Sequence, residues 1–199
     1  MVNDIKNYTV EDGIRVYGSQ IDFFADEEGF IGSPNNETAI SILGRTEVIY
    51  NDSCLCNIDY CKEHDIAYYK GKINRMGVGV MVNGSIILTV KRRLEGGEAL
   101  CDRFSKALCS YLADKGLECV RHDNNDVMVS GGKVASGGEI LLGNGFYYMG
   151  YQISINQDVD AIKSICIGKP MLKYPRALSS FGITTEEIFD FCKYYWSNN

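Results

Sequence analysis

The sequence predicts an α+β fold: a largely antiparallel mixed sheet with helices packed against it. Two β-rich runs flank an Asn-Gly dipeptide, and a long segment with helical periodicity follows them. Further β-rich runs, separated by turn residues, then lead to a last helix. Strand and helix patterns are grouped along the chain instead of alternating, which is typical of this fold class.

The first clear strand pattern is Ala39–Leu43, and Asn57–His64 has the length of a short helix. The runs Val78–Val82 and Ser85–Val90 are β-rich and flank Asn83–Gly84. Asn-Gly best tolerates the positive φ angles of a two-residue type I′ turn. We therefore expect these two runs to pair as a β-hairpin.

Apolar residues recur at helical spacing through Gly97–Lys115, and Gly116 is well placed to end that helix. Beyond it we expect a β-meander, because turn residues separate four further β-rich runs. These runs are Leu117–Arg121, Asp126–Ser130, Lys133–Leu142 and Phe146–Ile155. A short helix is expected over Asp158–Ile165, and Thr184 with Glu187 forms a capping box that starts the last helix.

Composition limits the classes of function. The chain has 199 residues, which we expect to form a single domain, 1–199, whose segment 1–38 matches no clear pattern. A net charge of −6 disfavours nucleic acid as a partner. No apolar run is long enough to cross a bilayer, and the amino terminus lacks the pattern of a secretory signal. We therefore expect no membrane partner and a cytoplasmic protein whose eight cysteines remain reduced.

The strongest chemical pattern is the segment Asn125–Gly138, in which Lys133 starts an expected strand between two pairs of glycines. Glycines let a ligand approach the backbone closely, and an ammonium group there suits a phosphate or a carboxylate. The same residues also fit two tight turns with a solvated lysine between them, and Asp126 fits a carboxylate that caps a turn. The residues alone leave both interpretations open.

Five segments, taken in order, resemble the lipoate–protein ligase, octanoyltransferase and biotin–protein ligase superfamily, and most of all the catalytic domain of lipoate–protein ligase A. They are Ile42–Arg45, Met76–Val80, Asn125–Gly138, Asn144–Gly150 and Lys173–Ser180. The resemblance spans Ala39–Thr184. It implies a fold like that of the biotin ligases and class II aminoacyl-tRNA synthetases, without the accessory C-terminal domain of many lipoate ligases.

By this resemblance we expect acyl transfer, of the ligase or the octanoyltransferase kind, to a lysine of a small lipoyl-type carrier domain. Lys133 is then the catalytic residue, because the family's lysine contacts the acyl-adenylate or polarises the thioester carbonyl. The expected substrate-binding residues are Arg45, Arg75, Met76, Gly77, Gly79, Asn83, Asn125, Asp126, Ala135, Ser136, Gly137 and Gly150. The expected substrate is a small acyl compound, with ATP and Mg²⁺ if the enzyme is a ligase.

The expected substrate loop departs from the family pattern. Ile73 and Asn74 stand where the family has an arginine pair, Val78 replaces a glycine, and Asn83 replaces a histidine. A β-branched Val78 hinders the approach of an acyl chain to the backbone. These departures favour the alternative of a non-catalytic ligand-binding or protein-interaction member of the same fold, whereas Lys133 with its glycines favours catalysis.

The cysteines offer two further hypotheses. Cys166 lies near the position of a nucleophilic cysteine in some octanoyltransferases, and it equally fits a buried structural thiol because isoleucines flank it. Cys54, Cys56, Cys61 and His64 are metal-ligating residue types. Their spacing does not match a usual zinc site, so we expect no metal there.

Overall fold

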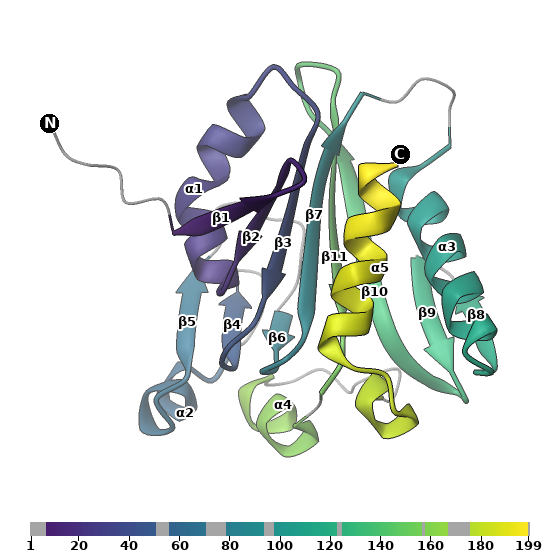
Figure 1. Ribbon diagram of the computed structural model, residues 1–199. Coiled ribbons are helices and arrows are strands. Elements are labelled where there is room, and N and C mark those ends of the chain that lie inside the picture. The colour runs from purple at the N-terminus through teal and green to yellow at the C-terminus, as the bar shows by residue number, and fades with distance from the viewer. Residues whose placement is uncertain are drawn as a thin grey trace, which may run out of the picture.

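The computed structural model describes residues 7–50, 56–70, 79–93, 98–122, 125–156, 158–166 and 176–198, which form two sheets and five α-helices (Figure 1). The larger sheet has the strand order β1-β2-β3-β7-β11-β10-β9-β8, and the smaller sheet has the order β5-β4-β6. The larger sheet contains β1 (Tyr8–Glu11), β2 (Ile14–Tyr17), β3 (Glu37–Ile42), β7 (Ile86–Arg92), β8 (Cys119–His122), β9 (Asp126–Val129), β10 (Gly132–Leu141) and β11 (Tyr147–Ile153). The smaller sheet contains β4 (Glu47–Tyr50), β5 (Ala67–Lys70) and β6 (Gly79–Met81).

The helices are α1 (Gln20–Gly32), α2 (Ile58–Glu63), α3 (Leu100–Asp114), α4 (Val159–Ile165) and α5 (Thr185–Ser197), with a short 3₁₀ helix, η2 (Leu178–Phe181). Among the described strand pairs, β2 with β3 and β4 with β5 run parallel, and the others run antiparallel. The last four strands among the described residues, β8 to β11, form the predicted meander. The predicted α+β class, with a mixed and largely antiparallel sheet, is confirmed.

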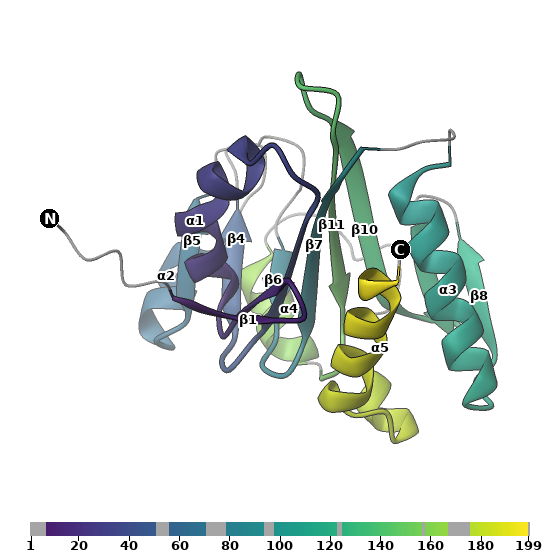
Figure 2. The same cartoon turned by 45° about the horizontal axis from the view of Figure 1, so that its top comes forward.

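Helices α3 and α5 cover one face of the larger sheet, and α1 and the smaller sheet lie on the other (Figure 2). The main core lies under α3 and α5, where Phe104 of α3 meets Tyr151 of β11 edge-on at 5.1 Å. The predicted C-terminal end of α3 and the predicted N-terminal start of α5 are confirmed. Gly116 has a φ of +83° just beyond α3, and Thr184 and Glu187 form the capping box of α5.

The hairpin predicted around Asn83–Gly84 is wrong. Strand β6 pairs with β4 in the smaller sheet, whereas β7 pairs with β3 and β11 in the larger one, so this turn carries the chain between sheets. Of the two turn residues, Gly84 alone has a positive φ (+82°), and the N–H of Ser85 donates to the Val82 carbonyl, as in a type II turn. Residues Ile86–Lys91 are buried, because β7 is a central strand with partners on both edges, which leaves β6 no edge to join.

The segment 1–38, which matches no clear pattern in the sequence, contributes a hairpin and a helix. Asp12 and Gly13 join β1 to β2, and both have positive φ angles, as a type I′ turn requires. Strand β2 then pairs in parallel with β3, so the hairpin extends the larger sheet. The Asp-Gly dipeptide between two β-rich runs is the sequence signal that marks this hairpin.

A buried carboxylate from the smaller sheet caps the N-terminus of α1. Glu47, at the start of β4, is fully buried. Its carboxylate accepts hydrogen bonds from the Ser19 hydroxyl at 2.6 Å and from the N–H groups of Gln20 and Ile21 at 3.0 and 3.2 Å. A negative charge at this end of the helix complements the helix dipole, so the contact fixes α1 to the smaller sheet.

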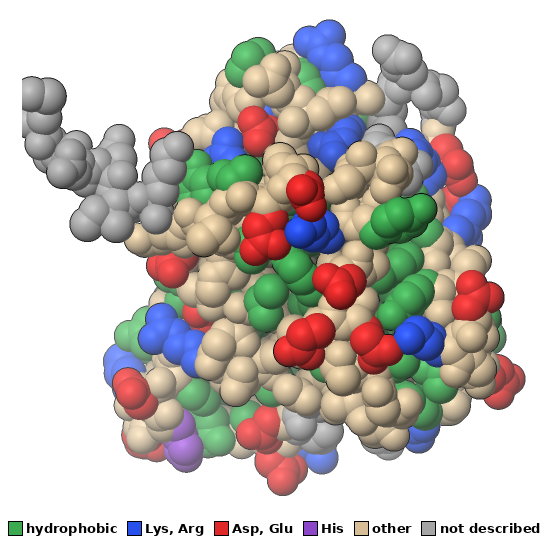
Figure 3. Space-filling view, in the orientation of Figure 1, with side chains coloured by type: hydrophobic (Ala, Val, Ile, Leu, Met, Phe, Trp, Pro, Cys, Tyr) green, Lys and Arg blue, Asp and Glu red, His purple; other side chains and the backbone are tan. Residues whose placement is uncertain are grey.

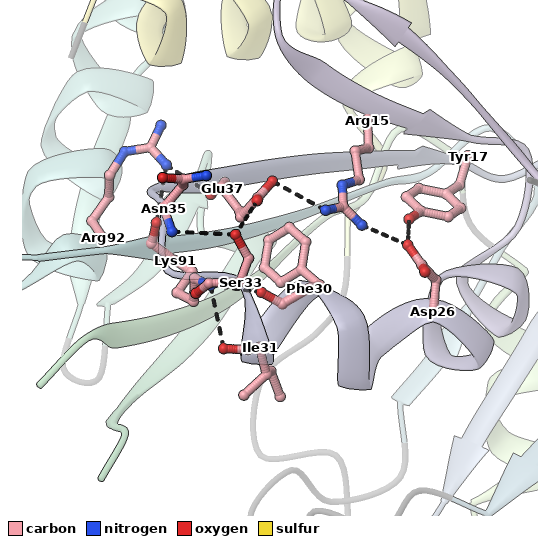
Figure 4. Close-up of polar contacts among 10 residues, drawn as sticks. All are labelled: Arg15, Tyr17, Asp26, Phe30, Ile31, Ser33, Asn35, Glu37, Lys91 and Arg92. Carbon is pink, nitrogen blue, oxygen red and sulfur yellow. Dashed lines mark hydrogen bonds and ion pairs between the residues drawn. The ribbon is translucent and has the colours of Figure 1, made fainter. Parts of the chain in front are cut away.

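A buried ammonium from the larger sheet caps the other end of α1 (Figure 4). Lys91 of β7 is fully buried, and its Nζ donates to the carbonyl oxygens of Phe30, Ile31 and Ser33 at 2.7, 3.3 and 2.6 Å. Burial lowers the pKa of Lys91. A positive charge suits the C-terminus of a helix, so opposite charges from the two sheets hold the two ends of α1.

A second polar group joins α1 to the N-terminal hairpin (Figure 4). Arg15 of β2 lies 2.6 Å from Asp26 of α1 and 3.3 Å from Glu37 of β3, and the Tyr17 hydroxyl donates to Asp26 at 2.7 Å. These contacts connect the hairpin, the helix and the sheet. The N-terminal segment is therefore an integral part of the packed structure.

Charged side chains of both signs are spread over the face that carries α5, and the described part of that face shows no extended area of lysine and arginine (Figure 3). Among the helices of the described residues, none is both long and apolar enough to cross a membrane.

Candidate active site

A β-bulge in β10 decides where Lys133 points. Lys133 pairs with Met128 of β9, but Ala135 pairs with Val127, so Val134 is the extra residue of the bulge. Val134 and Ala135 both pack in the main core, and Lys133 therefore projects to the opposite face. In a regular strand Lys133 and Ala135 would share a face. The bulge thus turns Lys133 away from α3 and α5, toward the face on which α1 and the smaller sheet pack.

Small and polar side chains follow Lys133 on this face. Cross-strand partners project to the same side of a sheet, so the register defines two adjacent rows. One row is Ser136, Gln152, Ile87 and Ser41, and the other, which we call the small-residue row, is Gly138, Gly150, Thr89 and Ala39. Because no side chain in the small-residue row is larger than threonine, backbone forms much of its surface.

The two glycines at the centre of β10 have different roles. A Cβ on Gly137 would lie 2.1 Å from the Tyr151 ring and 2.6 Å from the Gly150 carbonyl oxygen, so Gly137 makes room for core packing. A Cβ on Gly138 would meet no atom within 4 Å. Gly138 therefore leaves open space on the face that carries Lys133, where a ligand can approach the backbone.

Asn125 and Asp126 lie beside Lys133 across the pairing of β9 and β10. Asp126 shares a face with Met128, two residues further along β9, and hence with Lys133; it is 9% exposed. Asn125 has a φ of +65°, and its carbonyl accepts a hydrogen bond from the Tyr151 hydroxyl. Burial raises the pKa of Tyr151, so the hydroxyl stays protonated as a donor. Tyr151 thus positions the turn that delivers Asp126.

The segment that contains Arg176 meets the strand of Lys133. The N–H of Arg176 donates to the Lys133 carbonyl at 2.8 Å, and the Arg176 Cβ would lie 2.7 Å from a Cβ on Gly132. Two motif segments far apart in the sequence are therefore in direct contact. Gly132 is needed for this close packing, whatever the ligand.

Other expected residues lie elsewhere. Arg45 is largely exposed, with its Nε 3.4 Å from Glu47, and Asn83 lies in the turn between the two sheets. The Ala135 methyl packs in the main core, and Cys166 packs in a separate cluster under the smaller sheet. Gly79 starts β6. Arg75, Met76 and Gly77 lie outside the described residues.

Several residues on the Lys133 face were not among the expected site residues, including Gly138, Thr89 and Gln152. The Gln152 Nε2 donates to the Val80 carbonyl of β6 at 3.1 Å, so it connects the face to the smaller sheet. No sequence signal identifies Thr89 or Gln152, because only the register of the strands brings them beside β10. Gly138 carried a signal, since it follows Gly137 in the glycine-rich segment.

Tyr148 lies two residues before Gly150 on β11 and bounds the small-residue row. It projects to the Lys133 face, and its hydroxyl donates to Glu27 of α1 at 2.7 Å. Burial raises the pKa of Tyr148, which keeps this donor protonated. Within the described residues, no group of three metal-ligating side chains comes together.

Residues 35–193 match the model of a protein family described as "Lipoyl protein ligase A/B catalytic domain". No curated protein sequence matches the chain. A lipoate-protein ligase A bound with ATP superposes with a TM-score of 0.73 at 12% identity, covering 90% of this chain and 79% of that one. A structure from an archaeal lipoylation system of Thermoplasma acidophilum, described as a bi-partite lipoate protein ligase and its E2 lipoyl domain, superposes with a TM-score of 0.73 at 13% identity. The match covers 92% of this chain and 80% of that one.

A biotin protein ligase variant from Aquifex aeolicus in complex with biotin superposes with a TM-score of 0.50 at 12% identity, covering 89% of this chain and 64% of that one. At these identities the likenesses show the fold, and they confirm the predicted lipoate and biotin ligase architecture. The family match covers most of the chain and confirms the resemblance of its motifs. The chain belongs to the lipoyl protein ligase A/B catalytic domain family.

Proposed function

We propose that this protein activates an acyl group as an adenylate with ATP and transfers it to a lysine of a small lipoyl-type carrier domain. The observation that carries this proposal is the bulge in β10, which puts Lys133 on one face with Asp126, Ser136 and Gly138. Membership of the family and the likeness to an ATP-bound lipoate-protein ligase support it.

In this proposal Lys133 acts on developing negative charge. Its ammonium stabilises the phosphate of the adenylate and the oxyanion that forms when the acceptor amine attacks the acyl carbonyl. The acyl group lies over the small-residue row, where Gly138 leaves the backbone open. Ser136, on the same face, offers a hydroxyl to the polar end of the substrate.

ATP chemistry implies Mg²⁺, and the residues on this face fit an ion held largely by the nucleotide. Mg²⁺ usually keeps several waters and takes one or two carboxylates together with phosphate oxygens. Asp126 supplies one carboxylate on the face of Lys133 and would hold the ion. When bound, Mg²⁺ would neutralise phosphate charge.

The acceptor approaches Lys133 over β8 and β9. Lys133 pairs with Met128, which pairs with Val120, so these three residues follow one another to the edge of the sheet. Val120 is 56% exposed there, and α3 covers the opposite face. The likeness to a ligase described together with its E2 lipoyl domain supports an acceptor of this type.

The test uses the full chain with ATP, Mg²⁺, octanoate or lipoate, and a lipoyl domain with an unmodified lysine, followed by the mass of the carrier. Wild type should acylate the carrier, and Lys133→Ala should be slower by about 100-fold or more. Lys62→Ala is the matched control, because Lys62 is an exposed lysine on α2 paired with Asp59. Equal rates for Lys133→Ala and wild type would contradict the proposal.

Two further outcomes separate the alternatives. Transfer from an octanoyl thioester without ATP, abolished by Cys166→Ser, would make the protein an octanoyltransferase and exclude the adenylate. The second outcome is that no carrier is acylated and that neither ATP nor octanoyl-AMP shifts the Tm of wild type more than it shifts the Tm of Lys133→Ala. The chain is then a non-catalytic member of its family.

A further inference from the structure

Cys56 and Cys61, which are close in the sequence, meet the distant Cys166 under the smaller sheet. Cys56 forms an isolated antiparallel β-bridge with Cys166, and its thiol is hydrogen-bonded to that of Cys61. All three belong to the hydrophobic cluster that packs α2 and α4 against β4 and β6. The proposed adenylate route uses none of them, so their meeting needs its own explanation.

The backbone around Cys56 and Cys166 has the geometry of a cross-strand disulfide. The N–H of Asn57 donates to the Ile165 carbonyl at 2.9 Å, and the Asn57 Nδ2 donates to the Ser164 carbonyl at 3.2 Å. The hydrogen bond therefore flanks the cysteine pair, which makes it a non-hydrogen-bonded pair with Cα atoms about 4.5 Å apart and side chains on one face. Disulfides span Cα separations of about 4.4–6.8 Å, so the bond can form without backbone movement.

We propose that Cys56 and Cys166 are a modification site, a thiol pair that closes to a reversible disulfide on exchange with a low-molecular-weight disulfide. Both side chains are half-buried, whereas Cys61 is fully buried. A small reagent therefore reaches the bridge pair and not Cys61. This inference is independent of the proposed acyl transfer.

The exchange takes place in two balanced steps. The Cys166 thiolate attacks one sulfur of the reagent RSSR, which forms a Cys166–SR mixed disulfide and releases RS⁻. Cys56 then loses its proton to solvent and attacks the Cys166 sulfur, which forms the Cys56–Cys166 bond and releases the second RS⁻. Two protein thiols are oxidised, and RSSR is reduced to two RSH.

Burial raises the pKa of Cys56 to about 12, so little of it is thiolate at neutral pH, and we place it in the second, resolving step. Its thiolate fraction rises about tenfold per pH unit below that value, so closure should accelerate as pH rises. The bridge held by Asn57 compensates for the small thiolate fraction by keeping the two sulfurs adjacent.

The cross-link would tie Cys56, two residues before α2, to Cys166, the residue directly after α4. These points are far apart in the sequence, so the bond restricts the unfolded chain strongly. The oxidised protein should therefore have a higher Tm than the reduced protein, and dithiothreitol should reverse the change.

The test treats the full chain with oxidised glutathione, blocks remaining thiols with iodoacetamide and maps peptides by mass spectrometry. The expected product is a Cys56–Cys166 linked peptide that has lost two hydrogen atoms and separates on reduction. Cys56→Ser should instead stop at a stable Cys166–glutathione adduct. The control Cys119→Ser removes a half-buried cysteine outside this cluster and should still give the link.

Alkylation of both Cys56 and Cys166 after prolonged treatment would overturn the proposal. A Cys56–Cys61 link in its place would do the same, because it would show that proximity of thiols and not the bridge decides the pairing. Since the mapping reads the bond directly, a loss of acyl transfer cannot be mistaken for either result.

Discussion

The two faces of the larger sheet differ in the size and polarity of their side chains. Under α3 and α5 the strands carry large apolar residues, such as Leu88, Met149 and Ile153, in one continuous core. On the opposite face the central strands carry the small-residue row, beside Ser136 and Gln152. The first face supplies most of the core, and on the second face Gly138 leaves open space above the backbone. Substitutions on the two faces should therefore separate loss of folding from loss of binding.

The largest effect is expected on the helix-covered face. Phe104 of α3 is fully buried against Tyr151 and three aromatic rings of α5. Phe104→Ala should lower the free energy of unfolding by about 3–5 kcal/mol, measured by urea denaturation. Tyr194→Ala, 73% exposed on α5, should change it by no more than about 0.5 kcal/mol. If the two substitutions lowered the free energy of unfolding by similar amounts, Phe104 would not be at the centre of the core.

Lys91 tests how the opposite face contributes to stability through α1. Lys91→Met keeps the length of the side chain but leaves the C-terminal carbonyls of α1 without their buried donor. We expect a loss of about 3 kcal/mol in urea denaturation, because hydrogen bonds to charged groups are among the stronger ones. A loss below about 1 kcal/mol would mean that water replaces the ammonium at this helix end.

The adjacent glycines of β10 give the sharpest test of the comparison. Gly137→Ala forces a methyl group against the Tyr151 ring and should cost about 2 kcal/mol of stability. Gly138→Ala meets no atom and should leave stability unchanged within about 0.5 kcal/mol, yet it should weaken binding of octanoyl-AMP, measured by calorimetry. If Gly138→Ala lost stability and Gly137→Ala weakened binding instead, the assignment of the two glycines to opposite faces would be wrong.

The smallest effect concerns an ion pair at the edge of the helix-covered face. Hydrogen bonds from Lys106 and from Arg121 hold the pKa of Asp102 at about 2. Because this value lies below that of the unfolded chain, the stabilisation is present above about pH 4 and is lost as pH falls toward 2. Asp102→Asn should therefore cost under about 1 kcal/mol at neutral pH. The difference from wild type, followed by thermal unfolding, should vanish near pH 2.

The sequence predicted the meander and the helices beyond residue 38, although not α1, because each of those elements depends on local signals. Gly116 and the Thr184–Glu187 capping box mark helix ends within a few residues. The Asn83–Gly84 turn shows the limit of such signals. A turn dipeptide indicates that the chain changes direction, but which strands pair on either side of it depends on distant residues.

The candidate site was predictable only in part, for the same reason. Lys133 and Asp126 stand out in the sequence, but a one-residue bulge at Val134 decides which face Lys133 takes. Thr89 and Gln152 reach that face through strand register, which no single segment encodes. Gly137 and Gly138 cannot be distinguished in the sequence. They differ in the folded chain, where a side chain at Gly137 would meet the Tyr151 ring and one at Gly138 would meet no atom.

The capped helix α1 has a consequence for any shortened version of the protein. A fragment that began at residue 35, where the family match starts, would lack α1 and both hairpin strands. Glu47 and Lys91 would then be left as opposite charges without the helix ends they neutralise, and β3 would present an unpaired edge. Such a fragment should aggregate during expression, so work on the protein should keep the chain from Tyr8 onward.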